Sequence, residues 1–325
     1  ANWRQFIQLQ AAPENPHALH NPRVTSMAGS SRDGLWLVGT RGDLDHLDPA
    51  SGSIEHHLDR ASGNIWLRSV AEDAAGHVWM GSYHLLLRYD PRSKQVRRWE
   101  YDDAANPAPS GTISQILSCQ QDLVWVRSGE GGLQARRTDG TVQWSAPPGS
   151  EAVSSGLVLS MLCGPDDRVW LGTDRGLARW DAQANRFEAV PGSPRLAVHA
   201  LRFSDDGVLW LGHNGALGLY QWDQQRLKLL DRIDASNEFP ALAPNGLVLD
   251  TQGVAWVTSS RGLLRVDPAS RAVRLYSVHD GLRSQEFAAT TLGMTRRGQV
   301  YAASGYGVVL LDPAALLPPT RRPAL

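Results

Sequence analysis

Histidine and cysteine are the residue types here best suited to metal or nucleophilic chemistry, and the chain carries ten of the first and two of the second. No two of them have the His-x-x-x-His or Cys-x-x-Cys spacing that directs two side chains at one ion. His56 and His57 are adjacent in a strand-like segment, where neighbouring side chains point to opposite faces. We therefore expect solvated strand residues there, and we predict no metal site and no cofactor.

The two cysteines, Cys119 and Cys163, lie near the same place in two copies of a repeat. Side chains so placed could meet across neighbouring strands, and a bridge needs Cα atoms within about 7 Å of each other. Free cysteine is among the most often buried residue types. We expect two buried thiols, with a disulfide as the alternative.

A sevenfold repeat provides the elements that must position these side chains. Each copy has an apolar run around an aromatic residue, then a turn of small residues and a second apolar run. The aromatic anchors are Trp36, Trp79, Trp125, Trp170, Trp210, Trp256 and Tyr301, with spacings of 43, 46, 45, 40, 46 and 45 residues. A period in the forties that fills a chain of 325 residues is typical of a propeller.

One copy, residues 156–190, shows how each blade is built. Four short apolar runs are separated by Gly, Pro, Asp and Asn turns, which predicts a four-stranded antiparallel meander. Seven copies predict an all-β, seven-bladed β-propeller. The predicted blades are residues 23–59, 65–101, 112–145, 156–190, 197–231, 242–277 and 287–313. The anchors lie on second strands, where they pack between blades, so we assign them to the core and not to a ligand.

The two ends of the chain predict how the ring closes. The last copy, residues 287–313, has only three strand-like runs, and residues 4–10 form an orphan run before the first copy. We predict that residues 4–10 supply the missing outer strand of the seventh blade and so leave fewer free sheet edges. Residues 314–325 are then a tail toward a further domain.

Composition excludes some classes of partner. Lys and Arg total 32 against 33 Asp and Glu, which gives no electrostatic reason to expect nucleic acid or an anionic membrane. No run approaches 18 apolar residues, so this segment is not expected to insert directly into a membrane.

Candidate ligand-binding residues follow from propeller geometry. Turns between the second and third strands share one face with the loops that join blades, and together they ring the central channel. The candidates on this face are Arg41, Trp66, Tyr83, His84, Glu130, Asp174, Arg175, His213, Asn214, Arg261, Arg283 and Tyr306. Aromatic faces beside hydrogen-bonding groups suit a small molecule or a neutral or weakly acidic oligosaccharide. Trp66 is singled out because it lies outside the repeated Trp position.

A motif shared by several copies connects the repeat to a known family. Residues 167–181 read Asp-Arg-Val-Trp-Leu-Gly-Thr-Asp-Arg-Gly-Leu-Ala-Arg-Trp-Asp, and residues 32–42 and 205–212 are close to it. The repeat resembles the two-component regulator propeller family. That resemblance implies a non-enzymatic, periplasmic sensor region of an inner-membrane receptor in bacteria. It also implies a downstream β-sandwich, a membrane helix and a histidine kinase or diguanylate cyclase as partners in the same chain, with a homodimer as one arrangement.

Two other classes of function remain open from the sequence. Streptogramin lyases are also seven-bladed, and His84, His213 and Glu130 could converge at the channel as a catalytic group of a lyase or hydrolase. A protein-interaction scaffold is the third alternative.

Overall fold

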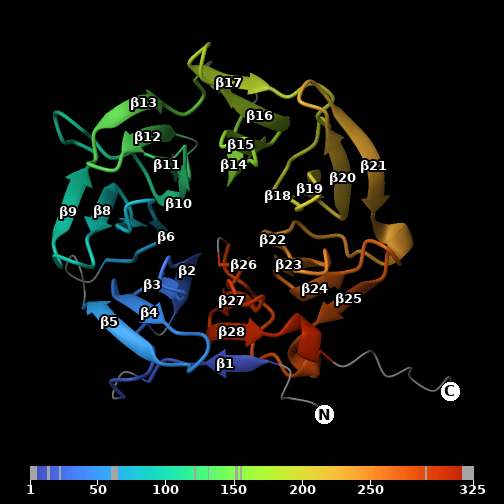
Figure 1. Ribbon diagram of the computed structural model, residues 1–325, viewed down its shortest axis with the longest axis horizontal. Helices are drawn as coiled ribbons and strands as arrows, with labels where there is room; N and C mark the ends of the chain where they lie inside the picture. Colours follow the sequence, from blue (N-terminus) through green and yellow to red (C-terminus); the bar gives the residue numbers. More distant parts are fainter. Residues whose placement is uncertain are drawn as a thin grey trace.

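The computed structural model describes residues 6–12, 15–21, 23–59, 65–120, 122–130, 132–150, 153, 156–289 and 291–316. They form seven four-stranded antiparallel sheets arranged around a central axis (Figure 1). The predicted seven-bladed propeller is confirmed. No helix in these residues is long and apolar enough to cross a membrane.

Each of the first six blades is a simple meander of four consecutive strands. Blades 1 and 2 contain β2 (Val24–Gly29), β3 (Leu35–Gly39), β4 (Leu44–Leu47), β5 (Ile54–Leu58), β6 (Ser69–Glu72), β7 (Val78–Gly81), β8 (Leu85–Tyr89) and β9 (Val96–Glu100). Blades 3 and 4 contain β10 (Ile113–Cys119), β11 (Leu123–Ser128), β12 (Leu133–Arg137), β13 (Val142–Ala146), β14 (Val158–Cys163), β15 (Val169–Thr173), β16 (Gly176–Asp181) and β17 (Arg186–Ala189). Blades 5 and 6 contain β18 (Ala200–Phe203), β19 (Val208–His213), β20 (Ala216–Trp222), β21 (Leu227–Ile233), β22 (Gly246–Leu249), β23 (Ala255–Ser259), β24 (Gly262–Val266) and β25 (Val273–Tyr276). Three short 3-10 helices, η1 (Ala235–Asn237), η2 (Val278–Asp280) and η3 (Pro313–Ala315), lie in the connections and at the end.

The seventh blade joins the two ends of the chain. Its strands β26 (Gly293–Met294), β27 (Val300–Ser304) and β28 (Gly307–Leu311) are completed by β1 (Ile7–Leu9), which pairs antiparallel with β28. The predicted closure is therefore present, and Figure 1 shows β1 along the outside of β28. Gly307 makes this pairing possible: its φ is 126°, and a Cβ there would collide with the Leu9 carbonyl oxygen.

The repeated aromatic residues lie in the core between blades. Six of the seven anchors are at most 3% exposed, and Tyr301 is 6% exposed. In blades 2 and 6 the indole N–H donates to an aspartate six residues earlier, Trp79 to Asp73 at 2.8 Å and Trp256 to Asp250 at 2.9 Å. These hydrogen bonds explain the acidic turn of the repeat, because a buried indole N–H needs an acceptor.

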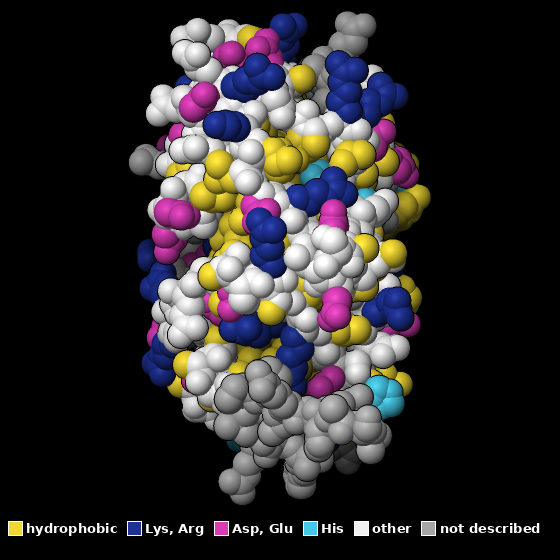
Figure 2. All heavy atoms as spheres, turned by 90° about the vertical axis from the view of Figure 1, so that its right-hand side faces the viewer, with side chains coloured by type: hydrophobic (Ala, Val, Ile, Leu, Met, Phe, Trp, Pro, Cys, Tyr) yellow, Lys and Arg dark blue, Asp and Glu magenta, His cyan; other side chains and the backbone are white. Residues whose placement is uncertain are grey.

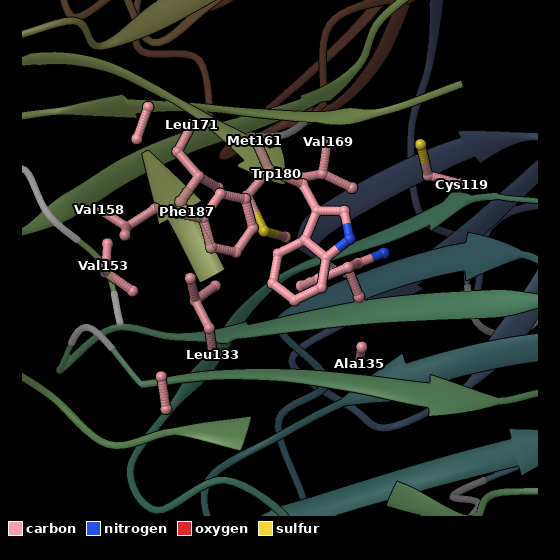
Figure 3. Packing of buried hydrophobic residues seen from close by; sticks show 13 residues of the cluster. Cys119, Leu133, Ala135, Val153, Val158, Met161, Val169, Leu171, Trp180 and Phe187 are labelled. Atoms are coloured by element: carbon pink, nitrogen blue, oxygen red, sulfur yellow. The ribbon is translucent and has the colours of Figure 1, made fainter. Parts of the chain in front are cut away.

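Blades 3 and 4 differ from this pattern. Their anchors, Trp125 and Trp170, have buried indole nitrogens without a hydrogen-bond partner, because Cys119 and Gly164 occupy the place of the aspartate. Trp170 packs between blades 4 and 5, whereas Trp125 belongs to the dense apolar cluster between blades 3 and 4 that Figure 3 shows. In that cluster Trp180 and Phe187 lie edge to face with ring centroids 5.1 Å apart. This interface therefore depends on apolar contact and not on the turn hydrogen bond.

The outer surface carries both charge signs. On the face shown in Figure 2, basic and acidic side chains alternate with apolar patches and form no large field of one sign. This distribution fits the near-zero net charge and gives no phosphate-binding footprint on that face.

Candidate functional site

The turns between second and third strands and the loops between blades lie on one face of the ring, as the meander topology requires. The first strands of the blades lie nearest the central axis (Figure 1). Two cavities of about 390 Å³ and 350 Å³ lie along those strands.

An aromatic patch on blades 2 and 3 gathers three of the predicted residues. Tyr83 is 63% exposed, and its ring lies 4.0 Å from that of His84. His84 Nδ1 accepts a hydrogen bond from the Gly111 N–H at 3.2 Å, so the imidazole is held in place. Glu130 lies against the same glycine, where a Cβ would be 2.8 Å from its carboxyl carbon.

Sequence reasoning missed one member of this patch. Tyr101 follows β9 directly, is 52% exposed, and its ring lies 4.3 Å from that of His84. Its backbone N–H donates to the His84 carbonyl at 3.1 Å. The end of a fourth strand was the signal for it, since that end lies on the same face as the turn that carries Tyr83. We call Tyr83, His84, Tyr101 and Glu130 the aromatic patch.

Trp66 lies in the loop that enters blade 2 and is exposed, with the Arg68 guanidinium carbon 4.7 Å from its ring centroid. One ring face is thus covered by a cation, a favourable arrangement for an indole. The carbonyl of Trp66 accepts from the Ser82 hydroxyl at 2.7 Å, which fixes the loop.

Three other predicted residues are occupied by local structure. Arg41 forms ion pairs with the buried Asp43 at 3.2 Å and with Asp59 at 3.5 Å, so its guanidinium stabilises blade 1. Asp174 accepts from the Leu157 N–H at 2.8 Å, which ties its turn to the segment that enters β14. The backbone of Arg283 donates to Gln8 at 2.8 Å, which places it beside the outer strand β1 and not at the inner rim.

The remaining exposed candidates are spread around the ring. Arg175, Asn214, Arg261 and Tyr306 lie on turns of blades 4, 5, 6 and 7 and are exposed. The backbone N–H groups of Arg175, Arg261 and Tyr306 each donate to a Ser or Thr hydroxyl two residues earlier. The repeated turn geometry thus explains their positions without a ligand.

His213 is the predicted residue whose surroundings differ most from the expectation. It is 4% exposed, its Nδ1 lies 2.9 Å from the Ala197 carbonyl, and burial lowers its pKa. A β-strand end that is covered by the loop from the preceding blade explains this burial. His84 and Glu130 lie together on the aromatic patch, but the buried His213 belongs to blade 5 and does not join that patch.

His56 and His57 are not the solvated residues that we expected. His56 Nδ1 lies 2.7 Å from the buried Asp45, its Nε2 lies 2.9 Å from the Pro16 carbonyl, and its ring stacks on His20 at 3.5 Å. His57 packs edge-on against Trp36 at 4.8 Å. The physical reason differs for the two residues. The segment after β1 covers His56, whereas His57 faces blade 2, where its Nδ1 lies 3.3 Å from the Tyr89 hydroxyl.

His20, Asp45 and His56 are also close enough for a cation, with ligand atoms within 4.8 Å of one another. Both ring nitrogens of His56 already face acceptors, however, and the two imidazoles are nearly parallel, at 6°. In this geometry the cluster is a hydrogen-bonded latch between blade 1 and the segment that follows β1.

The expectation of two free thiols is wrong. Cys119 and Cys163 form a disulfide, with Cα atoms 5.5 Å apart. They are the last residues of β10 and β14, the innermost strands of blades 3 and 4, and these strands come side by side at the axis. The bridge crosses the interface that contains Trp125, whose indole N–H has no acceptor.

A hollow on the opposite face was also missed. It has a volume of about 610 Å³, lies between blades 4 and 5, and is lined by Trp170, Trp222 and Arg179 among others. The Arg179 guanidinium lies 5.5 Å from one ring and 5.4 Å from the other and bonds to Asp166. The Arg179 guanidinium is paired with Asp166 and packed between the two indoles, although its Nε has no hydrogen-bond partner, and we interpret this hollow as interblade packing.

Comparisons with known proteins place this geometry in context. No family model matches the chain. The histidine kinase P4 of Formosa agariphila is 27% identical over 313 residues. That match covers 89% of this chain but only 22% of the kinase. The chain thus spans less than a quarter of that relative.

Solved structures support the fold. The extracellular domain of BT4673 from B. thetaiotaomicron, described as a one-component system, has a TM-score of 0.73 and 17% identity over 95% of this chain and 40% of that one. Virginiamycin B lyase from Staphylococcus aureus has a TM-score of 0.68 and 10% identity over 94% of this chain and 97% of that one. At these identities the likeness establishes the propeller fold alone.

The buried histidines predict how stability depends on pH. Burial lowers the pKa of His46, His57 and His213 below 6.5, so the folded state binds fewer protons than the unfolded state as pH falls through 6.5. We expect stability to fall below pH 6.5, by up to about 1.4 kcal/mol per pH unit for each histidine that stays neutral. Urea titrations at pH 7.5, 6.5 and 5.5 measure this slope.

His213→Asn is the matched variant for that slope, because an amide N–H can replace Nδ1 as donor to Ala197 and cannot titrate. This variant should reduce the dependence of the free energy of unfolding on pH by up to about 1.4 kcal/mol per pH unit, which corresponds to one proton. Asp45 acts in the opposite direction, since burial raises its pKa, and the stability linked to its proton is lost as pH rises through the folded value. A stability that does not change between pH 7.5 and 5.5 would contradict the prediction.

Proposed function

We propose that this propeller is a non-enzymatic, periplasmic ligand-sensing domain of a bacterial membrane receptor. The observation that carries the proposal is the match to the histidine kinase P4, which spans 89% of this chain but only 22% of the kinase. A module of this size within a kinase fits an input region. The resemblance of the repeat to the two-component regulator propellers points the same way.

The disulfide supports the proposed compartment. Bonds of this kind persist in the bacterial periplasm and are rare in a reducing cytosol. The bond between Cys119 and Cys163 joins neighbouring blades, so the packing of these blades in the folded ring brings the two cysteines together. The downstream β-sandwich, membrane helix and kinase or cyclase output, and a homodimeric receptor, are parts of this same proposal.

The aromatic patch is the proposed contact surface for a small molecule or oligosaccharide. It combines two exposed tyrosine rings with an oriented imidazole and a carboxylate. Tyr rings give contact area together with a hydroxyl that can bond. Ligand binding would bias signalling through its different affinity for two arrangements of the receptor.

Binding measurements on the isolated propeller test this function. Calorimetry with a panel of neutral and acidic oligosaccharides should reveal saturable binding, and Tyr83→Ala should weaken it at least tenfold, or about 1.4 kcal/mol. Tyr306→Ala is the matched control, because Tyr306 is equally exposed at 63% but lies on blade 7. No binding by the panel, together with no response of a receptor reporter to it, would refute the proposal.

The enzymatic alternative requires a different result. The virginiamycin B lyase has the same fold, and His84 and Glu130, both beside Gly111, are the imidazole and the carboxylate that the aromatic patch offers for acid–base chemistry. A turnover assay on the same panel with His84→Ala separates the two functions. Saturable product formation that is lost in this variant would show that the protein is a lyase or hydrolase and would contradict the proposed sensor function.

A further inference from the structure

Arg127 departs from the repeat at a position that is small in every other blade. It lies two residues after its anchor, Trp125, on β11. The residues at the same offset in the other six blades are Val38, Gly81, Gly172, Gly212, Thr258 and Ala303. A long cationic side chain at this place is therefore a feature of blade 3 alone and not a consequence of the repeat.

The space at this position explains why the other blades use small residues. The next blade comes so near that a Cβ on Gly172 would lie 2.5 Å from the Val198 carbonyl oxygen. A Cβ on Gly212 would lie 2.9 Å from the Pro244 side chain. Arg127 must instead extend between blades 3 and 4 toward the inner strands, and its Nη1 donates to the Val158 carbonyl of β14 at 3.0 Å.

The guanidinium of Arg127 has no anionic partner among the described residues. No carboxylate oxygen in that part of the chain lies within 4.0 Å of it, and its Nε is buried without a hydrogen-bond partner. Burial lowers its pKa to about 10, so it remains charged at neutral pH. Burying an unpaired cation is costly. The buried Arg136 offsets this cost with several carbonyl acceptors, whereas Arg127 has the Val158 carbonyl and an unpartnered Nε, which leaves N–H groups suited to an anion.

The cavity that Arg127 lines is cationic, as a site for an anion requires. It lies along the inner strands of blades 3 to 6 and has a volume of about 390 Å³. Arg202 and His199 line it as well, and none of the aspartates and glutamates that the structure describes does. His199 Nε2 is buried without a partner, like the Nε of Arg127. The whole chain has a net charge of −1, so this local excess of cations is not a general property of the protein.

The polar neighbours of the cavity are already satisfied. Gln115 donates to the Met161 carbonyl and accepts from the Met161 N–H, both at 3.0 Å, and Asn245 donates to the Phe287 carbonyl at 3.0 Å. Leu and Met side chains form much of the remaining wall. The groups left to bind are thus cationic or imidazole nitrogens in an apolar frame, which is the composition of a small-molecule anion site.

We propose that this cavity binds the carboxylate of a small acidic ligand, with Arg127 as the principal donor and His199 as a second. A guanidinium edge matches the two oxygens of a carboxylate, and apolar walls strengthen the contact by excluding water. The inference deepens the proposed sensing function, on which it rests, by naming the chemical class of ligand and a site inside the ring, apart from the aromatic patch.

Calorimetry on the isolated propeller tests the site with matched pairs of probes at constant ionic strength. Glucuronate has one carboxylate that glucose lacks, and succinate has two carboxylates where succinamide has two neutral amides. Sodium sulfate represents an inorganic oxyanion. We expect at least one carboxylate to bind while its neutral counterpart does not. Arg127→Gly should weaken that binding at least tenfold, and Arg127→Lys should weaken it less, because lysine keeps the charge but loses the fork.

Arg127→Gly should fold, since glycine occupies this position in three other blades; its melting curve and that of Arg127→Gln verify this. Arg175→Gly is the control, because that side chain is 78% exposed on the rim and does not line the cavity. Absence of binding by every carboxylate, binding of sulfate alone, or equal affinity in the Arg127 variants would overturn the site. If the Arg127 variants lose carboxylate binding but the receptor reporter does not respond to the carboxylate, the binding site is supported and the sensing function is refuted.

Discussion

Deletion of residues 1–12 is expected to open the ring and to lower the melting temperature by about 5–10 °C. The deletion removes β1, whose residues Ile7 to Leu9 pair with Leu310 to Val308 of β28. It also removes Phe6, which is 5% exposed and packs edge-on against Tyr276 at 5.6 Å. Loss of a buried Phe side chain alone costs about 3–5 kcal/mol, and the free edge of β28 adds a site for aggregation.

Two neighbouring point substitutions provide the control for this deletion. Phe6→Ala removes the buried ring and should lower the free energy of unfolding by about 3–5 kcal/mol. Ile7→Ala changes the adjacent side chain, which is 52% exposed, and should have little effect. Thermal and urea unfolding measure all three proteins. A deletion protein that melts like the full chain would show that β1 does not hold the ring closed.

The architecture could be predicted from the sequence because a propeller repeats its information. The anchor at Trp170 and the turns around it predict one meander, and six further copies leave few other folds. The closure could also be predicted, since three runs after residue 287 and one orphan run before residue 12 complement each other. Strand register and burial are set by alternation, which a sequence displays directly.

The candidate site could be predicted only in part, because turn side chains are directed by contacts that the sequence does not display. His84 and His213 lie in corresponding turns, yet one is fixed beside Tyr101 and the other is buried under Ala197. Likewise, His57 is covered because it packs against Trp36 of its own blade and Tyr89 of blade 2. Arg127 was not among the predicted site residues, because its role depends on the cavity and on the absence of an anionic partner among the described residues.

The sequence could not decide the state of the cysteines, since this depends on the distance between two blades. Cys119 precedes its anchor by six residues and Cys163 precedes its anchor by seven, so their alignment is only approximate. The ends of β10 and β14 converge at the channel, and this brings the Cα atoms to 5.5 Å. Convergence of inner strands toward the axis is a property of the closed ring and not of either blade.

Removal of the disulfide is expected to lower the free energy of unfolding by about 4 kcal/mol, because the bond closes a loop of 44 residues in the unfolded chain. It also joins the two blades whose anchors, Trp125 and Trp170, lack the hydrogen bond that Trp79 and Trp256 make. Urea unfolding of Cys119→Ser/Cys163→Ser, and of the unmodified protein with and without reductant, measures the effect. The reductant should destabilise the unmodified protein and leave the double variant unchanged. The bridge contributes nothing if reductant changes the double variant as much as the unmodified protein, or if the double variant and the reduced protein are both as stable as the oxidised protein. In either case, apolar packing alone must hold blades 3 and 4 together.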